Sequence, residues 1–319
     1  MAIREGVNET ILTELILQGI RDCQDLQIVT FLLLLVIYIL TMTGNILIIV
    51  LVVLNGKLHS PMYFFLANLS CVETFYTSTI LPKILISLLT GDLSISIPGC
   101  IAQFYFFTSL VVTECGLLAM MSYDRYIAIC KPLYYANLMN DRLCFLMAAG
   151  SWINGFLAMS VMMYLMTRLT FCGPNEIEHF FCDFIPVARV SCSDTRKFEL
   201  MGFIFSTIFT LFPFLLTLTS YTLIIISILR IQSTIGRQKA FSTCSSHLVV
   251  VTIYFGTLII VYSNHSQDID KFLSLSYTVL SPLLNPLIYS LRTREVRGAL
   301  KSAITVHISL TKRCAQEVE

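Results

Sequence analysis

The sequence predicts an all-α membrane protein: a seven-transmembrane helix bundle with an extracellular N-terminus and a short amphipathic helix after the seventh span. The first observation is composition, because 56% of the 319 residues are hydrophobic and only 13% are charged, where a soluble protein carries about 25% charged residues. The second is a set of seven apolar segments, each long enough to cross a bilayer as a helix. The third is an unequal distribution of basic residues between the loops.

The apolar segments are expected to form spans at residues 28–54, 60–89, 98–122, 143–166, 199–229, 246–263 and 272–291. None of them shows the sustained alternation of apolar and polar residues that a membrane β-barrel needs. We find no internal repeat and no long linker. The chain 1–319 is therefore expected to form one domain, with an extracellular N-terminus at 1–27, a helix bundle at 28–291 and a cytoplasmic tail at 292–319.

The basic residues indicate the orientation of the bundle in the membrane. The loops after spans one, three and five, together with the tail, hold thirteen of the 21 Lys and Arg residues: Lys57, Arg125, Lys131, Arg142, Arg230, Arg237, Lys239, Arg292, Arg294, Arg297, Lys301, Lys312 and Arg313. Cytoplasmic loops carry such an excess, so the N-terminus is expected outside. The sequon Asn8-Glu9-Thr10 then predicts glycosylation of Asn8. Residues 292–306 show the pattern of an amphipathic helix lying on the inner leaflet.

Four cysteines fall on the predicted outer face: Cys100, Cys172, Cys182 and Cys192. Disulfides form in such an oxidising environment. Four cysteines allow three connectivities, and their spacing does not choose between them.

Glu73 and Glu114 are the only acids well inside the apolar segments. Polar neighbours on nearby spans are Asn45, Asn68, Ser122, Ser281 and Asn285. Two carboxylates among neutral oxygens suit a hard monovalent cation such as sodium, or a shared proton. A protonated acid with a purely structural role is an equal alternative.

The run from Met121 to Cys130 places the adjacent charges of Asp124 and Arg125 at the end of a long apolar segment. Charges at membrane depth cost about 2.5–3.5 kcal/mol on insertion scales, so they pair, lie at an interface or serve a mechanism. Phosphate loops, metal-ligand spacings and catalytic triads are missing from the sequence, and the five histidines are scattered. We therefore expect no enzyme.

Several motifs in order resemble those of rhodopsin-like G-protein-coupled receptors, and among them the vertebrate odorant (olfactory) receptors. The motifs are Gly44-Asn45, Leu58 to Leu66 (LHSPMYFFL), Met121 to Cys130 (MSYDRYIAIC), Lys239 to His247 (KAFSTCSSH) and Pro282 to Tyr289 (PLLNPLIY). The resemblance extends from about Leu15 to Ala299.

The resemblance implies an activation switch in which Arg125 of the Asp124-Arg125-Tyr126 triplet is held by Asp124 at rest and then freed to face a G protein. Tyr221 would become a partner of Arg125. Asn285, Pro286 and Tyr289 would relay the motion of the bundle. The resemblance also implies the disulfides Cys100–Cys182 and Cys172–Cys192.

The family's ligand pocket lies in the outer halves of spans three, five and six. Helical spacing on those spans then gives a ligand-binding set of Phe104, Phe107, Thr108, Val111, Val112, Phe205, Ser206, Phe209, Phe255, Leu258, Ile259 and Tyr262. Phe107 stands where amine receptors resemble one another in having aspartate, and residues 272–291 contain no lysine to hold retinal. The family's usual Phe-Tyr-Gly is replaced here by Tyr254-Phe255-Gly256, which makes the role of Phe255 less secure than that of Tyr262.

The implied function is an odorant receptor that binds a small volatile lipophilic molecule, activates a stimulatory (olfactory-type) heterotrimeric G protein and raises cyclic AMP. The expected partners are the odorant, the G protein and membrane lipids, with no nucleic acid. No cofactor is expected, and a sodium ion is the one candidate modulator. The implied location is the plasma membrane of olfactory sensory neuron cilia, as a multi-pass protein.

Two alternatives stay open at this point. A transporter or channel would use Glu73 and Glu114 as an ion path, although the chain lacks the repeated halves that many transporters show. The second alternative is a chemoreceptor of the same fold that is expressed outside the nose, or a non-signalling product. Both have the same sequence features as an odorant receptor, and only tissue expression separates them from it.

Overall fold

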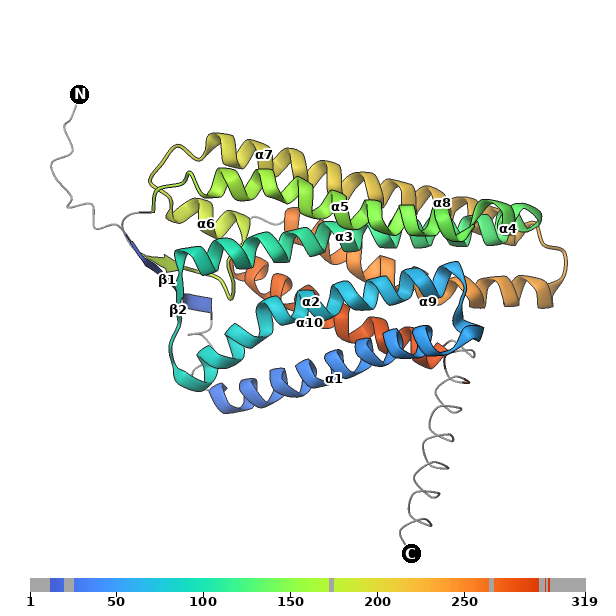
Figure 1. Ribbon diagram of the computed structural model, residues 1–319, viewed down its shortest axis with the longest axis horizontal. Helices are drawn as coiled ribbons and strands as arrows, with labels where there is room; N and C mark the ends of the chain where they lie inside the picture. The colour runs from blue at the N-terminus through green and yellow to red at the C-terminus, as the bar shows by residue number, and fades with distance from the viewer. Residues whose placement is uncertain are drawn as a thin grey trace, which may run out of the picture.

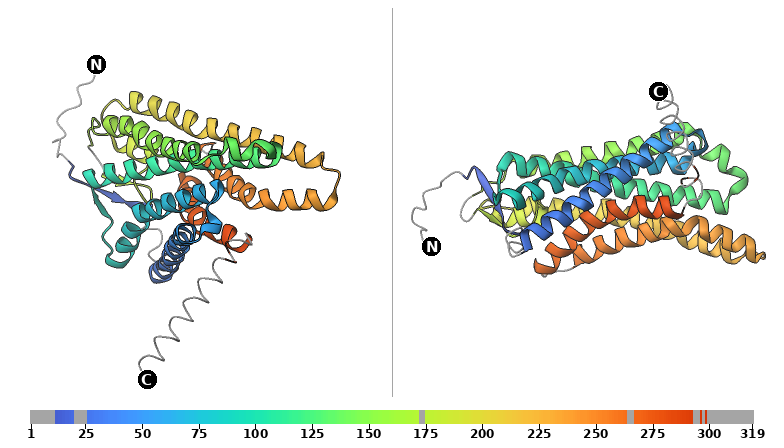
Figure 2. Two further views of the ribbon diagram at one scale, coloured as in Figure 1. Left: turned by 45° about the vertical axis from the view of Figure 1, so that its right-hand side comes forward. Right: turned by 90° about the horizontal axis from the view of Figure 1, so that it is seen from below.

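A computed structural model describes residues 12–19, 26–171, 175–263 and 267–292, together with 296 and 298. Its long helices lie side by side in an elongated bundle (Figure 1), and a second view from below shows the same arrangement (Figure 2). The long helices are α1 (Gln27–Leu54), α2 (Pro61–Thr90), α3 (Ile97–Cys130), α5 (Asp141–Met166), the continuous run of α7 (Arg196–Ser206), η4 (Thr207–Leu211) and α8 (Phe212–Leu229), then α9 (Thr234–Ser263) and α10 (Gln267–Arg292). Among the described residues, the first five of these are each long and apolar enough to cross a membrane. The predicted seven-helix bundle is confirmed.

Short elements occupy the two ends of the bundle. At the outer end are the strands β1 (Glu14–Leu17), β2 (Ser94–Ser96) and β3 (Glu176–Ile177), with the helix α6 (Phe184–Val190). At the cytoplasmic end are the short helices η2 (Gly56–Leu58), η3 (Pro132–Tyr134) and α4 (Tyr135–Leu138). Figure 1 shows the strands and α4 at opposite ends of the bundle.

The helix boundaries follow from local sequence. Pro61 begins α2 at a position where a missing N–H costs nothing, and Gly91 ends the helix in the left-handed conformation at φ 74°. Asn140 caps α5, because its side chain accepts a hydrogen bond from the Leu143 backbone N–H at 2.9 Å. Ser96 caps α3 in the same way.

Two helices are longer than the apolar pattern predicts. Helix α3 continues past residue 122 to Cys130, and α9 begins at Thr234 rather than near 246. Both extensions lie at the cytoplasmic end, where helices reach beyond the hydrocarbon and hydropathy loses its signal. Asp124 and Arg125 are therefore helical residues rather than loop residues.

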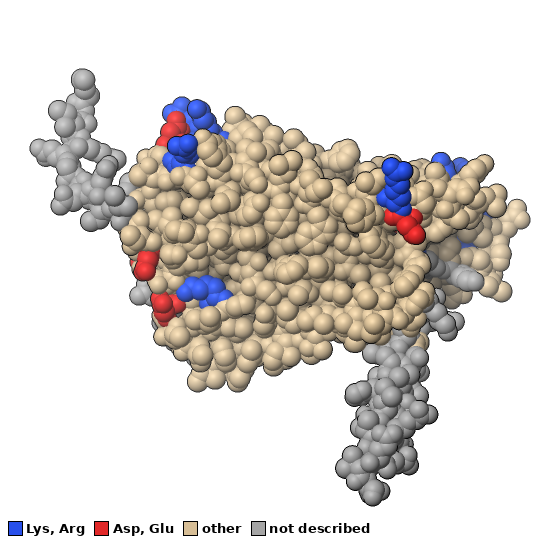
Figure 3. Space-filling view, in the orientation of Figure 1, with Lys and Arg blue, Asp and Glu red and all other residues tan. Residues whose placement is uncertain are grey.

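The bundle is apolar on its outside, as a lipid-embedded protein requires, and it buries a set of polar side chains within an otherwise apolar core. Ile28, Leu54 and Phe203 are at least 70% exposed, whereas Glu73 and Glu114 are almost completely buried. Figure 3 shows Lys, Arg, Asp and Glu only near the two ends of the visible face, with an uncharged band between them. That band is the surface that faces the hydrocarbon.

A three-stranded sheet in the order β2-β1-β3 covers the outer end. Strand β1 pairs antiparallel with β2 and parallel with β3, so the segment before α1 joins two loops that are distant in sequence. Leu15 and Leu17 of β1 are fully buried.

Candidate functional site

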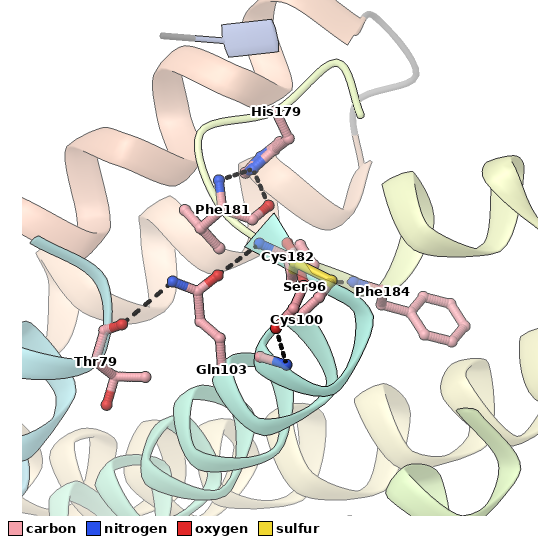
Figure 4. The surroundings of a disulfide bond; sticks show 10 residues. Thr79, Ser96, Cys100, Gln103, His179, Phe181, Cys182 and Phe184 are labelled. Carbon is pink, nitrogen blue, oxygen red and sulfur yellow. Dashed lines mark hydrogen bonds between the residues drawn. A yellow bond between two sulfur atoms is a disulfide. The ribbon is translucent and has the colours of Figure 1, made fainter. Parts of the chain in front are cut away.

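The outer site begins with the bond that ties the loop after α5 to the top of α3. Cys100 and Cys182 form a disulfide, as the resemblance implies. Gln103, one turn below Cys100, accepts a hydrogen bond from the Cys182 backbone N–H at 3.0 Å and donates one to the Thr79 carbonyl at 3.2 Å. Figure 4 shows Gln103 between these two partners beside the disulfide. The loop is thus fixed to both α2 and α3.

The other predicted bridge is tested only in part. Cys192 is disulfide-bonded, but Cys172 lies outside the described residues, so the pairing of these two cysteines stays a prediction. Asn8 and its glycosylation also lie outside the described residues.

Below the loop is a cavity of about 70 Å³. Eight residues of the predicted ligand-binding set line it: Phe104, Phe107, Thr108, Val111, Val112, Phe205, Ser206 and Phe209. Residues that the sequence did not single out complete the wall, namely Cys115, Met159, Met162, Asp183, Phe184, Gly202 and Thr210. The cavity therefore lies between α3, α5 and the run of α7 and η4.

The predicted residues from α9 behave differently. Phe255 and Leu258 are buried, but neither lines the cavity. The Tyr254 hydroxyl donates to the Val111 carbonyl of α3 at 3.1 Å, while the Phe255 ring packs on Phe214 of α8. Tyr254 thus occupies the position facing α3. The side chains of Ile259 and Tyr262 lie outside the described residues.

Rings close the cavity from above. Phe107 packs on Phe181 of the loop with ring centroids 4.9 Å apart, and on Tyr76 of α2 at 5.1 Å. Phe184 of α6 packs on Phe198 of α7 at 4.7 Å. Asp183 is the one carboxylate among the lining residues, and its Oδ1 accepts from the Phe184 backbone N–H at 2.7 Å.

Glu73 and Glu114 lie in one polar cluster at the centre of the bundle. Asn285 of α10 donates to Glu73 Oε1, and Ser281 donates to Glu114 Oε1 at 3.5 Å. Asn45 donates to the Pro282 carbonyl at 3.2 Å. One oxygen each of Asn45, Glu73 and Glu114 is buried without a hydrogen-bond partner within the described part of the chain.

The inner site is the ion pair at the cytoplasmic end of α3. Arg125 Nη2 lies 2.6 Å from Asp124 Oδ2, and Arg125 Nε donates to the same oxygen at 3.0 Å. The Tyr135 hydroxyl of α4 donates to Asp124 Oδ1 at 2.8 Å. Both oxygens of the buried carboxylate thus accept hydrogen bonds, which holds the ion pair in one geometry.

Other predicted switch residues lie around this pair. Tyr126 is half-buried near Tyr123 and Lys131. The Tyr221 hydroxyl lies 2.6 Å from His247 Nδ1 of α9, so in this conformation its hydrogen-bond partner is His247 rather than Arg125. Pro286 packs against Gly44, where an added Cβ would lie 3.0 Å from the proline ring. The side chain of Tyr289 lies outside the described residues.

Sequence reasoning missed Tyr135 and His247. His247 belongs to the Lys239 to His247 motif, so its place in that motif was the signal that could have identified it. Tyr135 carries no comparable signal, because a tyrosine eleven residues after Asp124 reaches back to it only when the chain turns through η3 and α4.

Comparisons with known proteins identify the family and the fold of the chain. The sequence model of the olfactory receptor family matches residues 34–307. Human olfactory receptor 10A7 is 47% identical over 93% of this chain and 96% of its own length, and human olfactory receptor 6B1 is 48% identical over 92% and 95%. Mouse olfactory receptor 8U3 is 46% identical over 93% and 95%.

Squid rhodopsin shares the fold, with a TM-score of 0.72 and 15% identity over 90% of this chain and 87% of that chain. The relatives are receptors rather than enzymes, and the family and the apolar helices place the protein in the plasma membrane as a multi-pass protein. The chain belongs to the olfactory receptor family, whose members are G-protein-coupled receptors with the fold of rhodopsin.

Proposed function

We propose that this receptor binds a small, volatile, lipophilic odorant in the outer cavity, then activates a heterotrimeric G protein of the stimulatory, olfactory type and raises cyclic AMP. The observation that carries the proposal is the layout of α3. Its outer half supplies Phe104 to Val112 to the cavity, and its inner end holds the Asp124–Arg125 pair. One rigid helix therefore connects the two sites.

The chemistry of the cavity favours a neutral ligand. Its walls are mostly aromatic and aliphatic, with the hydroxyls of Thr108, Ser206 and Thr210 and the Asp183 carboxylate as polar groups. Thr108 Oγ1 donates to the Phe104 carbonyl at 2.7 Å, so its lone pairs can accept a hydrogen bond from a ligand hydroxyl. The volume of about 70 Å³ is far below the usual range of drug-sized pockets, which favours a small molecule.

The ion pair supplies the switch. A buried pair with two discrete arrangements is an element that a ligand shifts by a few kcal/mol of differential binding. When α9 moves outward, Arg125 leaves Asp124 and faces the G protein, and Tyr221 exchanges His247 for Arg125. Asn285, Pro286 and Tyr289 in α10 relay the motion, because Asn285 donates to Glu73 and Pro286 lies inside the helix, where a proline removes a backbone hydrogen bond.

A sodium ion in the central cluster is proposed as an allosteric modulator. The fit rests on the buried, unpartnered oxygens of Asn45, Glu73 and Glu114, which are hard ligands of the kind that alkali cations take. These three residues would hold the ion, which would supply positive charge beside the two carboxylates. If the proposal holds, replacing sodium by N-methylglucamine will change odorant potency in wild-type receptor but not in Glu114→Gln.

The test of the main proposal is odorant-dependent cyclic AMP in transfected cells, using a panel of diverse volatile compounds. The variant Arg125→Ala should abolish the response with surface expression intact. Arg196→Ala is the matched control, because Arg196 is exposed at the outer end, and it should respond like the wild type. Unchanged signalling by Arg125→Ala would refute the switch, and the absence of any cyclic AMP response across the panel would count against the assignment of the G protein.

A further inference from the structure

A second cavity, larger than the odorant cavity, lies apart from it. It is a groove of about 630 Å³ at the cytoplasmic end, between α1, α2 and α5. None of the residues that line it belongs to the outer cavity, the central cluster or the ion pair. We call it the inner groove.

The body of the inner groove is apolar. Its walls include Val52, Phe64, Ala67 and Phe145, and the Phe145 side chain is exposed on the lipid-facing surface. The groove thus opens towards the bilayer rather than towards the interior of the bundle.

The deep end of the groove has few polar groups that are free to hydrogen-bond with a ligand. Asn68 lies there, but its side chain donates to the Phe64 carbonyl at 2.9 Å and accepts from Trp152 Nε1 at 3.2 Å. Satisfied polar groups do not recruit a ligand. The occupant must therefore have an apolar body.

The charged and hydroxyl groups among the lining residues lie at the cytoplasmic mouth. Asp141, the first residue of α5, is exposed there and forms no ion pair with any described side chain. His59 and Ser60, at the start of α2, also line the groove. The positive end of the α2 dipole adds to this wall. The α5 wall of the mouth therefore carries a carboxylate, and the α2 wall is suited to an anion.

We propose that the inner groove binds an inner-leaflet phospholipid with a primary ammonium headgroup, phosphatidylethanolamine. Its acyl chains fill the apolar walls, its ammonium donates to Asp141, and its phosphate lies against His59 and the start of α2. A carboxylate accepts hydrogen bonds, and a primary ammonium can donate them whereas a quaternary one cannot.

The same mouth disfavours other membrane components. A lipid with net negative charge meets the carboxylate of Asp141 at short range. A sterol has one neutral hydroxyl, which cannot provide both a cation for Asp141 and an anion for the start of α2. Phosphatidylcholine has the same shape and net charge as the proposed lipid but no N–H, so it is the sharpest comparison.

The experiment uses purified full-length receptor in nanodiscs of equal mixtures of phosphatidylethanolamine and phosphatidylcholine, followed by native mass spectrometry of the lipids that stay bound. We expect wild type to retain phosphatidylethanolamine in preference. Asp141→Asn should reduce that preference about fivefold, the effect of one charge near a membrane surface. Asp92→Asn, the same change at the outer end of α2, is the matched control and should retain the preference.

A second measurement needs no substitution. Cys71 lines the inner groove and is half-buried, while Cys130 is half-buried at the interface of α3 and α8. A membrane-permeant maleimide should label Cys71 more slowly in bilayers with phosphatidylethanolamine than in phosphatidylcholine alone, with labelling of Cys130 unchanged. Peptide mass spectrometry reads both sites.

Three outcomes would overturn the proposal. They are equal retention of the two zwitterionic lipids by wild type, preferential retention of added phosphatidylserine or cholesterol, and an unaltered preference in Asp141→Asn. None of these outcomes bears on the odorant response, so the proposed function is tested separately.

Discussion

The Tyr135 hydroxyl connects the cytoplasmic loop to the switch at the level of a single residue. It donates to Asp124, on the side of the carboxylate that Arg125 leaves free. Burial and the neighbouring Asp124 carboxylate raise the pKa of Tyr135. The hydroxyl therefore keeps its proton and acts as a donor to the buried charge.

Replacing Tyr135 by Phe should raise signalling without ligand. The change removes one hydrogen bond to a charged group, worth about 1.5–3 kcal/mol, from the conformation in which Asp124 holds Arg125. The measurement is basal cyclic AMP, normalised to receptor at the cell surface. Tyr134→Phe is the control, because Tyr134 is 63% exposed, and equal basal activity in the two variants would contradict the prediction.

Individual residues also mark the limit of prediction from sequence. The Asp124–Arg125 pair was predictable because two adjacent charges at the end of an apolar run need each other. The Tyr221–His247 contact was not, because it joins α8 and α9 and depends on how those helices are rotated. The sequence also could not predict that one carboxylate oxygen of Glu73 and one of Glu114 lack a hydrogen-bond partner. It did predict the polar cluster, because these two acids are isolated in apolar spans.

At the scale of elements, α3 and α5 approach each other closely at Gly155. A Cβ added there would lie 2.4 Å from Thr113 Oγ1 and 2.5 Å from the Ser109 carbonyl oxygen. The second of these neighbours is backbone and cannot rotate away. The glycine therefore sets the separation of the two helices beside the odorant cavity.

Gly155→Ala should lower the thermal stability of the purified receptor, by about 1–3 kcal/mol for overpacking of this kind. Gly150→Ala, in the same helix, meets no atom within 4 Å and should be neutral or slightly stabilising because alanine favours the helix. Thermal unfolding in one detergent compares the two. Equal melting temperatures would show that α3 and α5 can separate without cost.

The hydropathy of the sequence located the helices well, but it did not locate the breaks in their regular hydrogen bonding. Pro213 predicts a break in the fifth span, and the structure places a π-helical turn, η4, directly before it at Thr207–Leu211. A change of helical register leaves no mark on hydropathy. That register helps decide which of Phe205, Ser206 and Phe209 reach the cavity, so the face of the cavity from α7 and η4 was harder to predict than its α3 face.

At the scale of the whole molecule, the Cys100–Cys182 bond closes a loop across 82 residues of sequence. Removing a bond that restrains so long a segment should cost about 2–4 kcal/mol. Cys100→Ser should therefore lower the melting temperature and surface expression. Cys130→Ser changes a free, half-buried thiol and should leave both unchanged, and similar losses in the two variants would point to a general sensitivity to cysteine replacement.

The topology of the molecule was predictable because the bilayer imposes it, through span length and the placement of basic residues. The inner groove was not, because it is a gap between three helices whose facing residues are ordinary apolar ones. Its only signal in sequence is Asp141 at a helix start, where acids are common for capping reasons.

The outer sheet has a consequence for how the receptor is made. Strand β1 reaches the ribosome exit first, yet its parallel partner is β3, with Leu17 opposite Ile177. At about 5–20 residues per second, synthesis of the intervening chain takes roughly 8–32 s. During that interval Leu15 and Leu17 have no completed sheet to bury them, so we expect chaperones of the endoplasmic reticulum to bind this apolar segment until β3 has been made.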